Sequence, residues 1–268
     1  MRSIAHISDL HFGRIDPPVA EALVDDLRLH PATLLVVSGD FTQRARVGQY
    51  TQAAEYLKRL PVPQLVVPGN HDVPMYNFIR RFFFPLTRYR RHISQDLSPA
   101  FQDDELFVLG ANTARSFTQK SGWFAKEQLT EICRRLSAAP PGLTKVLVTH
   151  HPFIPPPGHP RENILRGASR ALTAFEHCGV DVLLAGHLHR AYHNDVRSHH
   201  VGARQSVLSI QAGTATSTRR RHDPNAWNYI TLEKDAVSVE VRAWDGRKFV
   251  QSSVSHYGRV EHIWLREM

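Results

Sequence analysis

The stretch that decides the fold of this chain is SIAHISDLH, residues 3–11. Its first six residues form a strand-like run with apolar Ile4, Ala5 and Ile7, and two polar side chains, Asp9 and His11, follow it. In α/β proteins, functional side chains lie just beyond the carboxyl ends of the strands. The stretch therefore predicts a central strand with a site at its end, into which Asp9 and His11 point from one turn.

The same arrangement, an apolar run followed by metal-binding side chains, occurs four more times in the chain. The four motifs are Gly39-Asp40, Gly69-Asn70-His71-Asp72, His150-His151 and Gly186-His187-Leu188-His189. Taken singly, an Asp-x-His is a frequent accident, Gly-Asp is a turn signal, Gly-Asn-His-Asp can be an ordinary loop, and only Gly-His-x-His suggests a site. Five motifs in order, each at the end of a predicted strand, are a very improbable accident, and we therefore expect them to form a single site.

Carboxylate, amide and imidazole groups in these motifs supply enough donors for two metal ions. Without thiolates, the set suits Mn, Fe, Zn, Co or Ni better than a calcium or magnesium cage. A carboxylate can bridge two ions, and Asp40 is the candidate because it stands alone in its motif. Two divalent ions about 3.5–4 Å apart are a common device for attacking phosphate esters with water. The sequence thus predicts a dinuclear site for phosphate ester hydrolysis.

Apolar runs and amphipathic segments alternate along most of the chain. We expect strands at residues 3–8, 33–37, 64–67, 106–110, 145–148 and 182–184, and helices at residues 18–30, 47–60, 125–138 and 163–178. This alternation predicts an α/β fold, in which helices pack on the faces of a sheet with parallel strands.

The C-terminal part has a different pattern, because its strand-like runs follow one another without helices. No internal repeat or low-complexity linker divides the 268 residues, which predicts one domain over residues 1–268. Residues 73–105 lack the alternation of strands and helices, and we expect them to form a cap or insertion. Antiparallel strands are expected at residues 190–196, 206–210, 227–233 and 236–243.

Composition and charge indicate where the protein is located and which classes of partner it can bind. The chain starts directly with a strand-like run, and no apolar run is long enough to span a bilayer, so we expect a cytoplasmic protein. Cys133 and Cys178 lie far apart and outside any CxxC motif, which predicts two thiols and excludes a zinc finger. The net charge of +8 favours anionic partners such as phosphate, nucleic acid or acidic lipid, unless it belongs to a solvated face.

Arginines gather in two parts of the sequence, at residues 80–91 and at Arg219, Arg220 and Arg221. The segment 78–91, FIRRFFFPLTRYRR, mixes them with aromatic residues. Such a segment can stack a nucleobase, lie on an anionic membrane or make a homodimer contact. We expect instead a cap that packs on the core with solvated arginines, so contact with a membrane surface is an open alternative and not the favoured one.

The joint order of the motifs resembles that of the calcineurin-like metallophosphoesterases over nearly the whole chain. The sequence GNHD at residues 69–72 and the double histidine before Pro152 are similar to the bacterial branch that includes class III cyclic nucleotide phosphodiesterases. Calcineurin-type protein phosphatases usually have Glu in place of Asp72, and lipid A precursor hydrolases usually have Arg in place of His71. The resemblance implies an α/β fold built as a two-sheet β-sandwich of mixed strands flanked by helices.

The resemblance also implies roles for individual residues. His71 would lie near the leaving oxygen, oriented by Asp72, where it donates a proton or stabilises charge. We prefer His150 to His151 as a ligand because it comes directly off the strand, although the order could be reversed. His151 and Arg14 are candidates for contact with the substrate. The first metal ion would be held by Asp9, His11, Asp40 and His189, and the second by Asp40, Asn70, His150 and His187.

The function implied by the resemblance is that of a phosphodiesterase with two divalent ions, which would be Mn, Fe, Zn or Co. It would hydrolyse a small phosphodiester, such as a cyclic nucleotide or a glycerophosphodiester, by in-line attack of metal-bound hydroxide. The alternatives are a metal-dependent phosphomonoesterase or nuclease of the same superfamily, and a metal-free scaffold with the same fold. The chain shows no dedicated nucleic-acid-binding module, which speaks against the nuclease.

Overall fold

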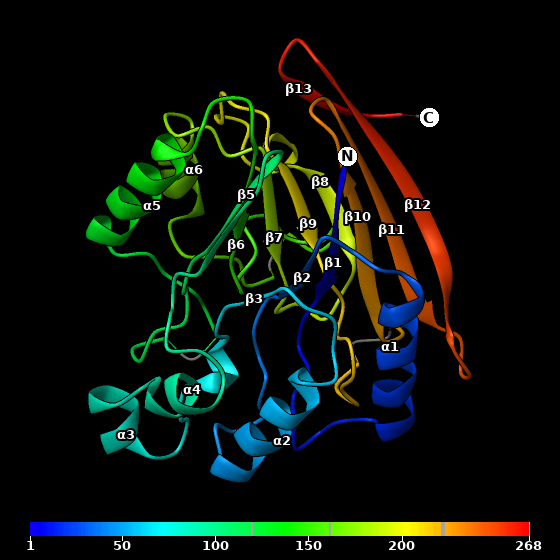
Figure 1. Cartoon of the computed structure of the whole chain (residues 1–268). Helices are drawn as coiled ribbons and strands as arrows, with labels where there is room; N and C mark the ends of the chain where they lie inside the picture. The colour runs from blue at the N-terminus through cyan, green and yellow to red at the C-terminus, as the bar shows by residue number, and fades with distance from the viewer. Residues whose placement is uncertain (119, 161, 221–222, 268) are drawn as a thin grey trace.

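Two β-sheets packed face to face form the centre of the protein (Figure 1). The computed structural model describes residues 1–118, 120–160, 162–220 and 223–267. Within this part of the chain, one sheet has seven strands and the other has six.

The seven-stranded sheet has the order β13-β12-β11-β10-β1-β2-β3. Strands β1, β2 and β3 run parallel to one another, and the other neighbours are antiparallel. The strands are β1 (Arg2–Ile7), β2 (Leu34–Val37), β3 (Gln64–Val66), β10 (Ala226–Leu232), β11 (Ala236–Trp244), β12 (Phe249–Val260) and β13 (Ile263–Arg266).

The six-stranded sheet has the order β4-β5-β6-β7-β9-β8. Strands β5, β6, β7 and β9 are parallel, and β4 and β8 pair antiparallel at the two edges. The strands are β4 (Ala100–Gln102), β5 (Leu106–Gly110), β6 (Thr144–Val148), β7 (Val182–Ala185), β8 (Tyr192–Asp195) and β9 (Leu208–Gln211).

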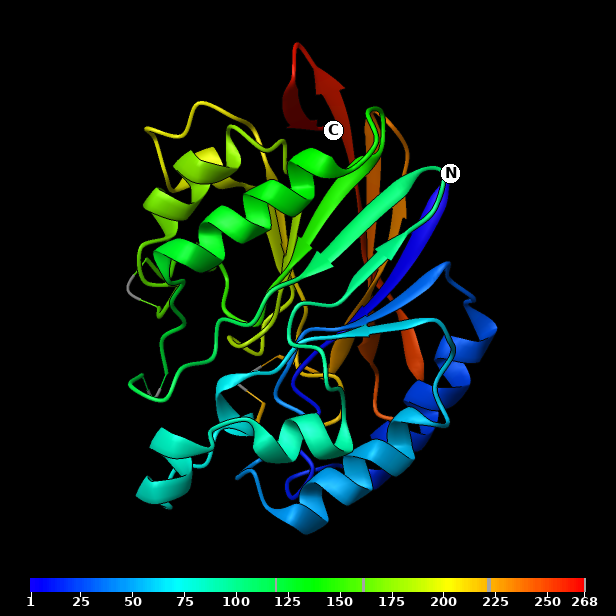
Figure 2. The ribbon, with the colours of Figure 1, turned by 60° about the vertical axis from the view of Figure 1, so that its left-hand side comes forward.

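Helices cover the outer faces of the sandwich (Figures 1 and 2). Helices α1 (Pro17–Leu29) and α2 (Val47–Leu57) pack on the first sheet, and α5 (Lys126–Ala138) and α6 (Ala168–Phe175) pack on the second. The short helices α3 (Phe78–Phe83) and α4 (Thr87–His92) lie at one corner, and 3-10 turns span Asn70–Asp72 and Val196–Ser198. None of the described helices is long and apolar enough to cross a membrane.

Strand β1 shows how the alternation of side chains builds three layers of core. Ile4 packs between the two sheets, whereas Ala5 and Ile7 point to the other face and pack under α1 and α2. The apolar run of β2 is buried at all four positions, as expected for a parallel strand that is covered on both sides.

The structure differs from the sequence-based expectations in three places. The strand predicted at residues 206–210 is antiparallel to only one of its neighbours, because β9 pairs antiparallel with β8 but inserts beside β7 and runs parallel to it. The predicted cap at residues 73–105 ends in β4, which pairs with β5 and belongs to the sheet. Strands β12 and β13 were not predicted, because exposed polar residues interrupt their apolar pattern.

The two cysteines face each other between α5 and the turn after α6. Cys133 and Cys178 are both free thiols, and one Sγ–H donates a hydrogen bond to the other sulfur at 2.7 Å. Cys178 is buried, as expected, whereas Cys133 is only partly buried.

Candidate metal centre

The candidate ligands follow the carboxyl ends of strands from both sheets. Asp9 and His11 follow β1, Asp40 follows β2 and Asn70 follows β3, while the histidine motifs follow β6 and β7. Every predicted metal ligand is less than 10% exposed. The structure thus brings together buried donor groups that are separated by up to 180 residues in the sequence.

Three donor atoms from opposite parts of the chain form a first group. Asp9 Oδ1 lies 3.4 Å from His11 Nε2 and 3.2 Å from His189 Nε2, and the two Nε2 atoms are 3.2 Å apart. Ligands that bind one ion at about 2.0–2.2 Å stand about 3–3.5 Å from each other, which matches these separations. Asp40 Oδ2 lies 3.6 Å from His11 Nε2 and can complete the group.

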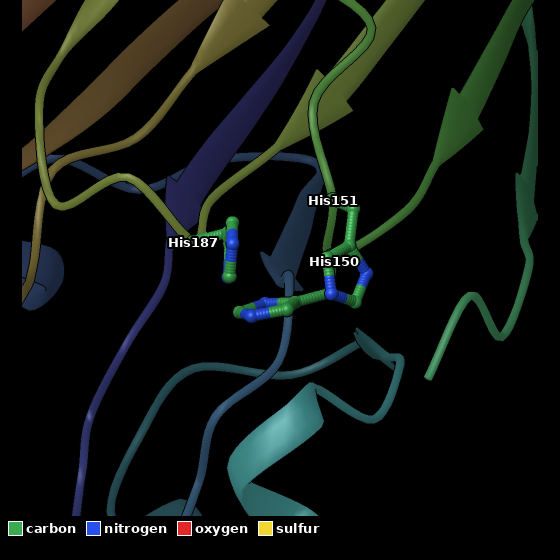
Figure 3. A group of neighbouring side chains, drawn as sticks. All are labelled: His150, His151 and His187. Carbon is green, nitrogen blue, oxygen red and sulfur yellow. The ribbon is translucent and has the colours of Figure 1, made fainter. Parts of the chain in front are cut away.

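A second group lies on the other side of Asp40. His150 Nε2 is 3.4 Å from Asp40 Oδ2 and 3.1 Å from Asn70 Oδ1. The ring centroid of His187 is 5.1 Å from that of His150, and Figure 3 shows these rings gathered with His151 beyond β6 and β7. One carboxylate oxygen of Asp40 therefore faces donor atoms of both groups.

The chemistry of this cluster suits a cation. Asp9 Oδ1 is buried and accepts no hydrogen bond from any described residue. Burial opposes the ionisation of Asp9, but the nearby histidines, His189 foremost, hold the pKa of its carboxyl well below the usual range. Oδ2 accepts the backbone N–H of His187, whereas a buried carboxylate oxygen without a hydrogen bond is costly, and a bound metal ion would remove that cost. The residues present therefore fit metal ions.

The protonation of the histidines also favours metal binding. Burial lowers the pKa of His11 to about 4 and that of His187 to about 3, so both rings are neutral at neutral pH, which is the form that binds a metal. Burial opposes the charge of His150 as well, but the Asp40 carboxylate raises its pKa to about 9. In the metal-free protein, a proton on His150 thus takes the place of a cation.

The backbone is strained at the ligands. Asp9, His11, Asp40, His187 and His189 have φ between 52° and 74°, in the left-handed region that side chains disfavour. They are five of the eight non-glycine residues with positive φ in the described part of the chain. Such residues persist where the surrounding structure forces them and concentrate at functional sites.

Glycines in two motifs make room for ligands from other motifs. A Cβ atom on Gly186 would overlap Ser8 Oγ and lie 2.6 Å from Asp9 Oδ2. A Cβ atom on Gly69 would overlap Asp40 Oδ1. These glycines are therefore required by close approach between loops, which the sequence could not show.

Backbone carbonyls orient two of the ligand rings. His150 Nδ1 donates to the Ser38 carbonyl at 2.7 Å, and His189 Nδ1 donates to the Arg219 carbonyl at 2.6 Å. Each bond holds a proton on Nδ1 and directs Nε2 into the cluster, where it would bind a metal ion in the neutral form of the ring, as is usual for metal-binding histidines.

His151 is the weaker candidate of the histidine pair. Its Nδ1 lies 2.7 Å from Thr113 Oγ1, and its buried Nε2 has no hydrogen-bond partner among the described residues. Because His151 is fully buried, its position does not favour the predicted contact with substrate. His150 contacts both Asp40 and Asn70, which favours it as the ligand.

His71 lies at the outer edge of the cluster. Its backbone N–H donates to Asp40 Oδ1 at 2.8 Å, and its Nδ1 donates to the Gln43 carbonyl at 2.9 Å. Its Nε2 lies 3.0 Å from Arg219 Nη1. A guanidinium only donates, so Nε2 accepts this bond and the ring is uncharged in this arrangement. The sequence did not link Arg219 to this site.

The structure differs from the prediction that Asp72 orients His71. The Asp72 carboxylate instead accepts backbone N–H groups of Gly69, Phe41 and Thr42 at 2.9–3.2 Å. Adjacent residues of the turn point to different sides, so Asp72 fastens the loops after β2 and β3 to each other. Burial, together with the nearby charge of Asp40, raises the pKa of Asp72 to about 7.

A positively charged cavity of about 710 Å³ leads to His71 and Asn70. No carboxylate lines this cavity in the described part of the chain, so it attracts anions. Arg14 lies at this opening, and its contact with substrate stays a prediction, whereas Arg221 lies outside the described residues. The cationic lining residues are Arg14, Arg44, Arg46, Lys120 and Arg219.

Comparison with known proteins points to one family. Residues 2–191 match the family model for the calcineurin-like phosphoesterases. The glycerophosphodiester phosphodiesterase GpdQ of Enterobacter lignolyticus is 31% identical over 166 residues, which are 57% of each chain. The 3',5'-cyclic adenosine monophosphate phosphodiesterase CpdA of Escherichia coli is 28% identical over 167 residues, 60% of this chain and 56% of that protein. The chain spans a little over half the length of these relatives.

Solved structures support the fold. Purple acid phosphatase PPD1 from yellow lupin aligns with a TM-score of 0.68 at 10% identity, over 93% of this chain and 52% of that one. A dimetal phosphatase from Danio rerio aligns with a TM-score of 0.66 at 16% identity, over 94% of this chain and 99% of that one. The predicted two-sheet α/β fold is therefore confirmed.

Proposed function

The chain belongs to the calcineurin-like phosphoesterase family, and on that premise we propose that it is a phosphodiesterase with a dinuclear metal centre. Its substrate would be a small phosphodiester. The observation that carries the proposal is the position of Asp40, whose Oδ2 lies 3.6 Å from His11 Nε2 in one donor group and 3.4 Å from His150 Nε2 in the other.

The assignment of ligands follows the two donor groups. When bound, the two ions would activate a water molecule and neutralise charge on the phosphate. Asp40 would be shared between them, and the carbonyl-oriented rings would keep their free Nε2 atoms directed at the ions. We assign Asp9, His11, Asp40 and His189 to one ion, and Asp40, Asn70, His150 and His187 to the other.

The cationic residues that line the cavity leading to His71, called the cationic mouth below, would bind and orient the phosphate. The cations around Arg14 and Lys120 attract an anionic substrate towards His71. We expect Arg219 to donate to a phosphate oxygen, because it already lies 3.0 Å from His71 Nε2 at the end of the cavity. Since Nε2 accepts a bond there, we assign His71 the role of positioning Arg219, whose guanidinium would stabilise charge, rather than donating a proton.

The choice of a diester rests on the relatives. The two curated proteins with the alignments described above are named for hydrolysis of glycerophosphodiesters and of cyclic AMP. Both are small phosphodiesters, and the cavity of about 710 Å³ is large enough for either class.

The proposal is tested with the purified protein after reloading with Mn, Fe, Zn or Co. Metal content is measured together with hydrolysis of cyclic nucleotides, glycerophosphodiesters, nucleoside monophosphates and bis(p-nitrophenyl) phosphate. We expect diesters to be hydrolysed faster than monoesters. Asp40→Ala should lose both metal and activity, whereas Asp25→Ala, at an exposed position on α1, should keep both.

Three results would overturn parts of the proposal. A preference for monoesters would remove the phosphodiesterase assignment and leave the metal centre. Degradation of DNA in preference to small diesters would indicate a nuclease. A protein that takes up no transition metal after reloading would be a scaffold that shares only the fold.

A further inference from the structure

A patch of exposed aromatic side chains borders the cationic mouth. The aromatic patch consists of Tyr76, Phe78, Ile79, Phe82, Phe83, Phe84 and Phe117, which are 45–89% exposed. These are seven of the fifteen large hydrophobic side chains that are exposed in the described part of the chain. Such a concentration on one surface is uncommon in a soluble monomer and marks an interaction site. The segment 78–91 packs on the core through Leu86 and Tyr89, as expected, but its phenylalanines are exposed, which was not expected.

The aromatic patch is held in place by a buried arginine. Arg81 is 5% exposed, and its guanidinium donates to the carbonyls of Ser116, Pro74 and Thr118 at 2.7–3.0 Å. These bonds fasten α3 to the loop that carries Phe117, whose ring lies 5.4 Å from that of Phe82. The patch is therefore a preformed surface, and α3, which carries much of it, lies at a corner of the molecule (Figure 2).

Positive charge surrounds the aromatic patch. Residues 73–95 contain five arginines and no Asp or Glu, and Arg80, Arg90 and Arg91 are exposed. Beside Phe117, a groove of about 840 Å³ is lined by further arginines and an aromatic ring, with no carboxylate among its described lining residues. These groove residues are Arg115, Arg166, Arg170 and Trp123.

The aromatic patch is continuous with the cationic mouth. The Arg44 guanidinium lies over the Tyr76 ring at 5.2 Å and donates to Met75 Sδ at 3.2 Å. Arg44, Met75 and Lys120 also line the cavity that leads to His71. A surface that covers the patch would therefore lie next to the opening of the metal centre.

We propose that the aromatic patch docks the protein on an anionic phospholipid surface. Aromatic rings and Ile79 enter the boundary between headgroups and acyl chains, while the surrounding arginines bind lipid phosphates. A second copy of the chain is a poorer occupant. A two-fold interface places the patch against itself, so arginines would face arginines without an acidic residue in 73–95 to pair with them.

The test is flotation of the full-length, metal-loaded protein with vesicles. One set contains phosphatidylcholine with phosphatidylglycerol, and the other contains phosphatidylcholine alone. We expect binding to the anionic vesicles only. The double variant Phe82→Ser, Phe83→Ser should bind them about tenfold more weakly, and Arg90→Gln with Arg91→Gln should weaken binding and its salt dependence.

The matched control is Val62→Ser with Val201→Ser, which removes two exposed apolar side chains outside the patch. This control should float like the wild type. Hydrolysis of bis(p-nitrophenyl) phosphate and a circular dichroism spectrum show whether each variant is folded. The readout is binding, so it is independent of whether the proposed phosphodiesterase activity is correct.

The following results would contradict the proposal and indicate another partner for the aromatic patch, or no partner. The proposal is wrong if the wild type stays at the bottom of the gradient, or if the Phe82, Phe83 variant floats equally well. It is also overturned if sedimentation velocity shows that the wild type is a dimer and that this variant is a monomer. Binding of single-stranded oligonucleotides without binding of vesicles would likewise replace lipid with nucleic acid.

Discussion

Replacing Asp40 with asparagine tests the central feature of the site. The substitution keeps the size and shape of a side chain that is 1% exposed and removes the charge that faces both donor groups. The amide oxygen can still accept the backbone N–H of His71, which donates to Oδ1 at 2.8 Å in the wild type. We therefore expect Asp40→Asn to fold and to lose metal affinity.

In the metal-free protein, the pKa of His150 gives the size of the contribution that Asp40 makes to the free energy of unfolding. Burial opposes the charge of His150, but Asp40 raises its pKa from 6.5 to about 9. A pKa that is raised in the folded state stabilises the fold fully below about pH 6.5, and this contribution is lost as the pH rises through 9. At about 1.4 kcal/mol for each pKa unit, the rise corresponds to about 3 kcal/mol.

Urea unfolding of the metal-free protein at about pH 6 and about pH 9.5 measures this contribution. Between these two values, the wild type should lose about 3 kcal/mol more of its free energy of unfolding than Asp40→Asn loses. In a His150→Gln background, Asp40→Asn should change the pH dependence little. Equal losses in the wild type and in Asp40→Asn would refute the interaction between Asp40 and His150 on which the reasoning rests.

Three further predictions concern other parts of the molecule. Gly186→Ala should lower metal content and hydrolysis at least about tenfold, because the added Cβ would displace a loop that carries ligands. Gly48→Ala, which has open space around its Cβ, should lower neither, and equal metal content in both variants would contradict the prediction. Asp26→Ala leaves Arg242 paired with Glu240 alone and the buried Trp227 Nε1–H without its acceptor, and urea unfolding should show a loss of about 3 kcal/mol; a loss below about 1 kcal/mol would refute the pairing. His71→Gln, which can still accept from an arginine, should retain more kcat than His71→Ala and leave the pH profile unchanged, and a profile that loses its alkaline limb would instead show proton donation.

The sequence predicted the elements that depend on local pattern. Buried parallel strands need continuous apolar runs, so β1, β2, β5, β6 and β7 were predicted close to their observed bounds. The candidate ligands could be predicted because each stands directly after such a run. The carboxyl ends of parallel strands present their loops at one edge, and the donors therefore converge as expected.

Features that depend on contacts between distant segments could not be predicted. The residues of β9 do not show that it pairs parallel with β7. That pairing depends on how the whole sheet packs. The contact between Arg219 and His71 joins residues 148 positions apart. The exposure of Phe83 and its neighbours depends on the burial of Arg81, which no periodicity of the segment reveals.

By itself, the sequence determined which donor groups are available and on which strand ends they stand. Only the tertiary structure decided that Asp40 faces both donor groups, that Asp72 fastens two loops instead of orienting His71, and that an aromatic surface borders the opening. The physical reason is that the local pattern of apolar and polar residues sets where a strand lies in the sequence, to within a few residues, and whether it is buried. The few ångströms that separate a metal ligand from a neighbouring structural residue are set by loops of both sheets packing against each other.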